Sequence, residues 1–172
     1  MKSGAQIVLA ILACAVTTAA DATAQIPDEI VIDGRTESLF AEPLQEAFRA
    51  NRWLQHNLAQ RTSKNGCTAS WRGYVATWEV RANELYLVSV KVDPCSSSTL
   101  VPLAELFSGA TGPIKATWFS GTLTVPQGNQ IAYVRMGYES RYERYLLLQV
   151  DKGRVTRSTS TSGQPNRTAP VK

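Results

Sequence analysis

The sequence has little of what catalytic and metal sites are made from. Its 172 residues include one histidine, three cysteines and two methionines. The lone His56 argues against a nucleophilic triad, because no G-x-S-x-G elbow surrounds any serine. Structural zinc takes four ligands at short spacings, which so few histidines and cysteines do not supply. Gly109 and Gly112 lack the spacing of a phosphate-binding loop. We expect no catalytic set, no metal and no cofactor.

Long apolar runs are also missing, apart from a short one near the start. Met1-Lys2 precedes an apolar stretch over 7–16, and small residues follow up to Ala22-Thr23-Ala24. A charged start, a short apolar run and an A-x-A site predict a secretory signal peptide over 1–24. The run is too short for a permanent membrane span, which needs about 20 residues. We therefore expect a periplasmic or secreted protein that begins at Gln25 and has no transmembrane span.

A second processing site lies inside the same segment. Ile11-Leu12-Ala13-Cys14 resembles a permissive lipobox, whose cysteine is acylated and becomes the new N-terminus. Leu12 is unusual two places before such a cysteine, whereas 22–24 form a good ordinary site. A lipoprotein anchored through Cys14 stays open as the alternative.

Cys67 and Cys95 remain after either kind of processing. Two thiols in an oxidising compartment favour one disulfide, the alternative being two unpaired buried thiols. A bridge across 28 positions contributes roughly 3–4 kcal/mol in the chain-entropy model. We expect the disulfide.

The charge is modest and lies mostly near the C-terminus. The net charge is +4, and Asp151 is the only acidic residue among the basic residues of the last 22 positions. A domain otherwise near neutrality lacks the footprint of a nucleic-acid binder. We expect no nucleic-acid partner and instead an unknown envelope protein or polymer.

The first half of the chain predicts a hairpin, a helix and a second hairpin. The first hairpin covers 29–40 with a turn at Asp33-Gly34, and the helix covers 43–54. The helix either ends before Trp53 or presents Trp53 outward. A polar loop follows over 59–70. The second hairpin covers 71–92 and turns at Ala82-Asn83.

The second hairpin has a specific predicted register. Pairing Arg81 with Glu84 puts Trp78 opposite Leu87, and in the same way Val80 opposite Leu85, on the core-facing side. The same register brings the two cysteines near each other at the open end.

The second half of the chain predicts one or two helical turns over 101–107 and then strands. The strands cover 114–125, ended by Pro126-Gln127-Gly128, then 131–136 and 145–150, with a turn over 151–153 and a short return through Val155. Residues 156–172 predict a disordered basic tail, which leaves a globular domain over 25–155. Because the strands have one polar face, we expect an α+β fold, a hairpin-rich antiparallel sheet with one packed helix.

Two clusters are candidate binding residues because tyrosine, tryptophan and arginine are enriched at binding hot spots. Packing and solvation of a β-face explain the same residues equally well. Trp118 and Phe119 point to opposite faces of one strand, so one of them is expected in the core. The candidate binding residues are Trp71, Arg72, Tyr133, Arg135, Tyr138, Arg141, Tyr142 and Arg144.

Paired carboxylates are the remaining route to catalysis. Glu79, Glu139 and Glu143 are the plausible members of a glycosidase-like pair, although surface ion pairs explain them as well.

Three segments in combination resemble a family of small uncharacterised bacterial proteins. They are 28–34 leading to Glu42-Pro43-Leu44; Cys67 with the W-R-G-Y-x-x-x-W-E segment over 71–79; and the W-F-S-G-T-L-x-x-P-Q-G segment over 118–128 with 133–138. The resemblance spans about 28–155. This chain departs from the family in having Arg135 in place of histidine and in having Glu42 and Gln45 in place of the asparagine and glutamate that flank Pro-Leu. The family has no named activity, so the resemblance implies kinship alone.

These observations favour a non-enzymatic binding or accessory domain in the cell envelope. An inhibitor or immunity-type protein against a secreted hydrolase is the first alternative, and a hydrolase that uses carboxylates on envelope polymer is the second.

Overall fold

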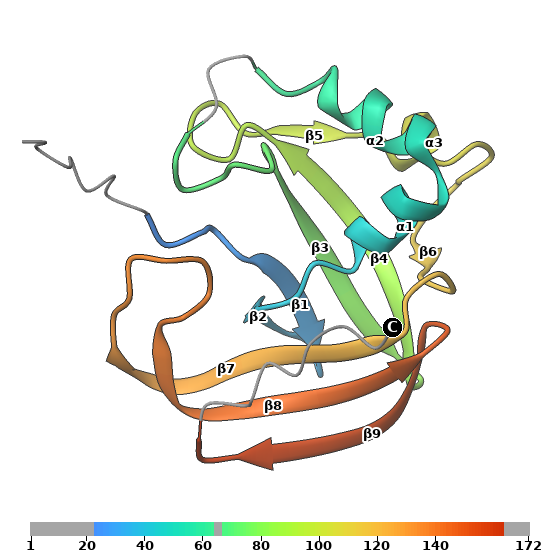
Figure 1. Ribbon diagram of the computed structural model, residues 1–172. Helices are drawn as coiled ribbons and strands as arrows, with labels where there is room; N and C mark the ends of the chain where they lie inside the picture. The colour runs from blue at the N-terminus through green and yellow to red at the C-terminus, as the bar shows by residue number, and fades with distance from the viewer. Residues whose placement is uncertain (1–22, 64–66, 164–172) are drawn as a thin grey trace, which may run out of the picture.

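A single mixed sheet of nine strands forms most of the molecule, as the computed structural model in Figure 1 shows; it describes residues 23–63 and 67–163. Three short helices lie on one side of the sheet: α1 (Leu44–Ala50), α2 (Arg52–Ala59) and α3 (Leu103–Leu106). The strands are β1 (Asp28–Ile32), β2 (Arg35–Leu39), β3 (Tyr74–Arg81), β4 (Glu84–Val92), β5 (Thr99–Val101), β6 (Ile114–Lys115), β7 (Gly121–Ala132), β8 (Arg141–Asp151) and β9 (Arg154–Thr161).

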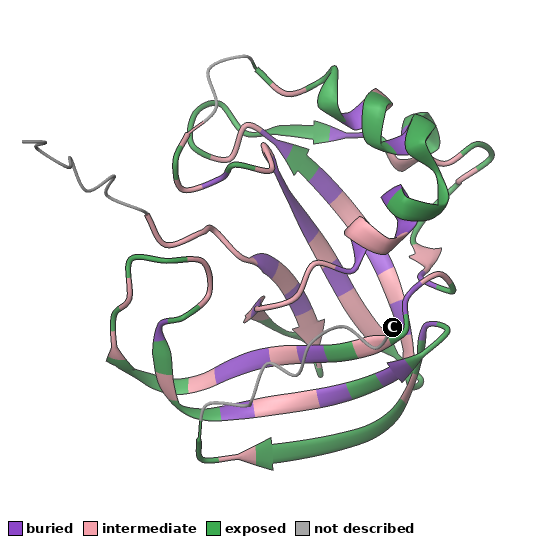
Figure 2. Cartoon of the chain, in the orientation of Figure 1, coloured by how far each residue is buried: buried purple, intermediate pink, exposed green. Residues whose placement is uncertain are grey.

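The sheet bends so that its two end strands approach each other. Its order is β2-β1-β3-β4-β9-β8-β7, with β5 and β6 added to β4. β4 and β9 meet at one pair, Glu84 with Arg154, and β7–β9 then run across the ends of β3 and β4 (Figure 1). At the far side the backbone N–H of Phe40 donates to the carbonyl of Thr124 (2.8 Å). The buried residues lie between these two parts (Figure 2).

The predicted α+β fold with one packed helix is wrong. The sheet is mostly antiparallel, but β1 pairs with β3 in parallel, and the helices are short. The predicted helix over 43–54 is broken at Asn51, whose φ of −139° is extended backbone. Its side chain accepts from the backbone N–H of Trp53 (3.1 Å) and Leu54 (3.4 Å), which starts α2. The first helix therefore ends before Trp53, and Trp53 is exposed on α2.

The β3–β4 hairpin confirms the predicted register. Arg81 pairs with Glu84, and Trp78 and Val80 lie opposite Leu87 and Leu85. Both turn residues, Ala82 and Asn83, have positive φ, as a two-residue hairpin turn of this kind needs. A bulge between Thr77 and Trp78 shifts the rest of the strand by one position.

The disulfide and several shorter predictions are also confirmed. Cys67 and Cys95 are bonded, with their Cα atoms 6.3 Å apart. The turns at Asp33-Gly34 and 151–153 form as expected, and α3 supplies the expected helical turn.

In the second half of the chain, several predicted strand boundaries are wrong. The expected strand over 114–125 is two strands, β6 and β7, separated by a turn. Pro126 does not end β7, because β7 is the last strand in the sheet order and an edge strand tolerates a residue without N–H. β7 ends at Ala132, so the strand expected over 131–136 is a loop.

The predicted disordered tail is wrong for its first residues. β9 continues to Thr161, because β8 begins at Arg141 and pairs with it as far as Tyr145–Thr161. Residues 164–172, Cys14 and the rest of 1–22 lie outside the described residues. No helix among the described residues is long and apolar enough to cross a membrane.

Candidate functional site

A buried ion pair joins the start of β1 to the start of β3. Nη1 of Arg72 donates to Oδ1 of Asp28 (2.9 Å), and both side chains are almost fully buried. Asp28 also accepts from the backbone N–H of Ala76 and from Nε1 of Trp78, each at 3.0 Å. Nη2 of Arg72 donates to the carbonyl of Ile26 (3.0 Å). One carboxylate therefore holds together β1, β3 and the turn before β3.

Burial and the neighbouring charge shift the pKa of each member of this pair in opposite directions. Burial raises the pKa of Asp28, while Arg72 and the donors from Trp78 and Ala76 oppose that rise. Burial alone would lower the pKa of Arg72, but the charge of Asp28 leads the neighbours that raise it, so the guanidinium stays charged. Removing either partner would leave the other buried without its counter-charge.

A partly exposed carboxylate and two tyrosines surround the far side of Arg72. Oε1 of Glu42 lies 3.6 Å from Nε of Arg72 and accepts from the hydroxyl of Tyr138 (3.1 Å). The guanidinium carbon of Arg72 lies 4.9 Å from the ring centroid of Tyr74. Burial raises the pKa of both tyrosines, so both hydroxyls are protonated at neutral pH. The sequence analysis did not single out Asp28 or Glu42 as site residues.

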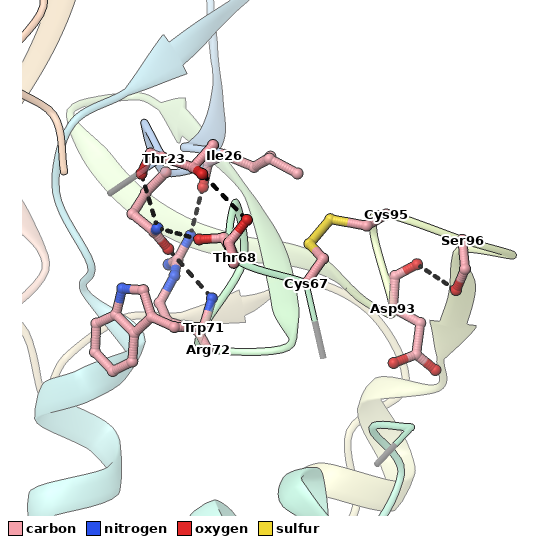
Figure 3. Close-up of a disulfide and its surroundings, with 10 residues drawn as sticks. Thr23, Ile26, Cys67, Thr68, Trp71, Arg72, Asp93, Cys95 and Ser96 are labelled. Carbon is pink, nitrogen blue, oxygen red and sulfur yellow. Dashed lines mark hydrogen bonds between the residues drawn. A yellow bond between two sulfur atoms is a disulfide. The ribbon is translucent and has the colours of Figure 1, made fainter. Parts of the chain in front are cut away.

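The W-R-G-Y part of the motif combines an exposed tryptophan with a buried arginine side chain, a partly buried glycine and a buried tyrosine. Gly73 has a φ of +73°, and a Cβ there would lie 2.8 Å from Cγ2 of Thr62. Arg72 and Tyr74 are inside, whereas Trp71 is 69% exposed. Figure 3 shows Arg72 turned toward Ile26 while the indole of Trp71 points away from the disulfide. The placement of Arg72 is therefore that of a structural residue.

Gln25 connects Trp71 to the loop between β7 and β8. The side-chain oxygen of Gln25 accepts from the backbone N–H of Trp71 (3.2 Å). The backbone N–H of Gln25 donates to the carbonyl of Gly137 (3.0 Å). Ala24 and Gly137 also form an isolated bridge. The two predicted binding clusters, far apart in sequence, therefore lie on the same side of the molecule (Figure 1).

The β7–β8 loop, residues 133–140, is held by its own contacts. The buried Ser140 accepts through Oγ from the backbone N–H of Val134 (3.0 Å). Tyr138 stacks on Phe40 with ring centroids 5.2 Å apart, and Tyr142 meets Phe40 edge-on at 5.7 Å. Tyr138 and Tyr142 are thus partly buried supports of the loop.

Large exposed side chains lie in the turn before β3, at the end of β7 and in the β7–β8 loop. We call them the contact surface: Trp71, Ile131, Tyr133 and Met136. Each is more than half exposed. The predicted arginines Arg135, Arg141 and Arg144 are exposed around it. The sequence analysis named Trp71 and Tyr133 but missed Ile131 and Met136; the apolar pattern there suggested a half-buried strand.

The three candidate carboxylates are not gathered into one site. Glu79 forms an ion pair with Arg81 on β3. Glu143 accepts from the backbone N–H and the side-chain amide of Asn129 (3.0 and 3.1 Å). Glu139 lies exposed in the β7–β8 loop. Among the described residues, no hydrogen bond or ion pair joins these carboxylates to one another.

The other singled-out residues have local roles. His56 lies exposed on α2 beside Gln60 (2.8 Å). Phe119 is the core member of its pair, while Trp118 is half-buried and donates to the carbonyl of Pro43 (3.1 Å). Gly109 lies in an exposed turn with Gly112 nearby.

Comparison with known proteins adds no family. Scans of the chain against protein-family models, curated proteins and solved structures find no match.

Within 23–63 and 67–163, no three His, Cys, Asp or Glu side chains gather in a metal-binding group.

Proposed function

We propose that this protein is a non-enzymatic binding or accessory domain of the cell envelope, which contacts its partner through Trp71 and the β7–β8 loop. One observation carries the proposal: two exposed groups distant in sequence are joined through Gln25, and the residue that follows Trp71 is anchored by a buried ion pair with Asp28. A surface held in one conformation loses little entropy on binding. Exposed tryptophan and tyrosine with nearby arginines have the composition of a binding hot spot.

The envelope location rests on the predicted secretory signal and on the disulfide. The disulfide Cys67–Cys95 supports folding in an oxidising compartment, periplasmic or extracellular. Intact mass of the protein from its host distinguishes the two processing routes. A mass beginning at Gln25 supports signal-peptide cleavage after Ala24, and a diacyl or triacyl Cys14 supports the lipoprotein.

The proposal is tested by retention on envelope fractions. Full-length protein is produced through export, and its retention on polymer, membrane and soluble-protein fractions is measured. The Trp71→Ala/Tyr133→Ala variant should lose retention on at least one fraction. Trp53 provides the matched control, because it is 59% exposed on α2, away from the contact surface. Equal retention of Trp71→Ala/Tyr133→Ala and Trp53→Ala, or no retention of the parent, contradicts the proposal.

An inhibitor of a secreted hydrolase is the second candidate, and the organisation of the loop favours it. Oγ of Ser140 accepts from the backbone N–H of Val134 inside the loop, and the backbone N–H of Gln25 donates to the carbonyl of Gly137 from outside. A preorganised exposed loop suits insertion into an active-site cleft. Secreted hydrolases of the host and its neighbours should then lose activity with the parent protein but not with Tyr133→Ala/Met136→Ala. Undiminished activity across that set removes this candidate.

A further inference from the structure

We propose that the partner of the contact surface is an anionic lipid bilayer, into whose interface the β7–β8 loop and Trp71 dip. This inference rests on the proposed function and names the chemistry of the partner. It follows from the kind of side chain exposed, the charges around it and the place where the described chain enters the fold.

The exposed side chains are those that a lipid interface favours. Ile131 is 61%, Tyr133 60% and Met136 55% exposed, and Trp71 is the most exposed of the four. Tryptophan and tyrosine prefer the headgroup level of a bilayer, and aliphatic side chains prefer the acyl boundary beneath it. Isoleucine and methionine have no hydrogen-bonding group for a sugar. A lipid surface uses all four side chains.

The charged neighbours favour an anionic surface over a neutral one. Arg135, Arg141 and Arg144 are exposed around the loop, and long arginine side chains reach headgroups while their stems stay in apolar contact. Two acidic residues oppose them, Glu139 in the loop and Glu143 on β8. Glu143 accepts hydrogen bonds from Asn129, which is neutral, so Glu143 keeps its negative charge. Attraction is therefore modest, and binding should weaken as salt screens it.

The chain enters the fold at the contact surface. Ala24 bridges Gly137, the residue after Met136, and Gln25 reaches both Gly137 and Trp71. After cleavage following Ala24, the new N-terminus at Gln25 lies beside this surface. In the lipoprotein alternative, the chain anchored through Cys14 enters the fold here, so this side faces the bilayer.

The loop reaches the interface in a fixed conformation. Ser140, the stacked Phe40–Tyr138 pair and the hydrogen bond from the backbone N–H of Gln25 to Gly137 hold its base. Apolar side chains on an ordered loop bind with little ordering cost. The same contacts keep these side chains from turning inward in solution.

Vesicle co-sedimentation of the exported protein tests the inference. Vesicles of phosphatidylethanolamine with phosphatidylglycerol are compared with phosphatidylcholine vesicles at low and high salt. The protein should sediment several-fold more with the anionic vesicles at low salt. Met136→Ser/Tyr133→Ser should lower that partition by about tenfold, since two exposed apolar groups no longer enter the interface. In a Trp53→Phe background, binding should shift the tryptophan emission to the blue, and Trp71→Phe should abolish that shift, because Trp78 and Trp118 stay packed in the fold.

A matched control separates binding through the loop from nonspecific hydrophobic binding. Leu100 is 59% exposed on β5, so Trp53→Ser/Leu100→Ser removes similar apolar surface elsewhere and should leave the partition unchanged. No sedimentation with anionic vesicles, or equal losses in the two double variants, overturns the inference. If vesicles fail while a polymer or protein fraction still retains the protein through Trp71, the lipid partner is wrong and the proposed function stands.

Discussion

Trp71 and Arg72 are neighbours in the chain, yet Trp71 is 69% exposed whereas the side chain of Arg72 is 1% exposed. Arg72 donates to Asp28 and Ile26 inside the fold, whereas the backbone N–H of Trp71 donates to Gln25 and the indole is exposed. One short motif thus contains a residue that organises the structure and a residue that the structure leaves available. The stability and the binding role of this motif should therefore separate under mutation.

The largest effect on stability is expected from Arg72→Ala. It leaves Asp28 buried without its counter-charge, which should lower the free energy of unfolding by about 3–5 kcal/mol. Urea unfolding measures the change. Arg81→Ala is the control, because its ion pair with Glu79 is at the surface and its loss should change stability little. If Arg72→Ala does not fold, Asp28→Asn/Arg72→Ala removes both charges while keeping a side-chain oxygen that can accept from Trp78 or Ala76, and should recover part of the loss. Equal effects of Arg72→Ala and Arg81→Ala would sink the comparison.

Removal of the disulfide should have the next largest effect. Cys67→Ser/Cys95→Ser releases a constraint that closes 28 positions, with an expected loss of about 3–4 kcal/mol. The disulfide ties the turn that carries Trp71 to the end of β4, so retention on the envelope fraction should weaken as well. Urea unfolding under non-reducing conditions measures the loss in the free energy of unfolding. A loss below about 1 kcal/mol would show that the turn is held without it.

Trp78→Phe should cost less, because it removes one donor and part of the buried indole but keeps an aromatic ring in the core. Oδ2 of Asp28 then lacks the indole N–H at 3.0 Å, an expected loss of about 1–3 kcal/mol. The corresponding Trp53→Phe substitution on exposed α2 should be near neutral. A near-neutral Trp78→Phe would mean that Arg72 and Ala76 alone satisfy Asp28.

Glu143→Gln should have the smallest effect and should depend on pH. Hydrogen bonds from Asn129 lower the pKa of Glu143, so its charged form is favoured in the folded state. A lowered folded-state pKa stabilises the protein above the ordinary glutamate pKa, and this contribution is lost as pH falls through the folded-state value. The difference between parent and variant should therefore shrink between neutrality and about pH 3. A difference independent of pH would contradict the assigned cause.

Local sequence predicted those elements whose partners are close in the chain. The β3–β4 register followed from the Ala82-Asn83 turn, and the disulfide followed from the two thiols of an exported chain, which that register brings near each other. Elements decided by distant partners were predicted less well. β9 continues through a Ser/Thr segment because β8 pairs with it, and β7 passes through Pro126 because it lies at an edge. Neither partner can be read from the segment itself.

The candidate site was likewise predicted from sequence only in part. Trp71, Tyr133 and the arginines were found from composition, because aromatic and arginine side chains are typical of contact surfaces. Asp28 was missed as the centre of the site because an aspartate before an apolar strand reads as a solvated residue. Its partners are more than 40 positions away in the chain, and only the parallel pairing of β1 with β3 brings them together.

The most direct measurement sets Trp71→Ser beside Arg72→Ala, with stability from urea unfolding and retention on the envelope fraction measured for both. We predict that Trp71→Ser stays within about 0.5 kcal/mol of the parent in stability and loses retention. Arg72→Ala should lose several kcal/mol of stability. A Trp71→Ser protein that is strongly destabilised, or that is retained as well as the parent, would contradict the division of this motif into a structural half and a contact half.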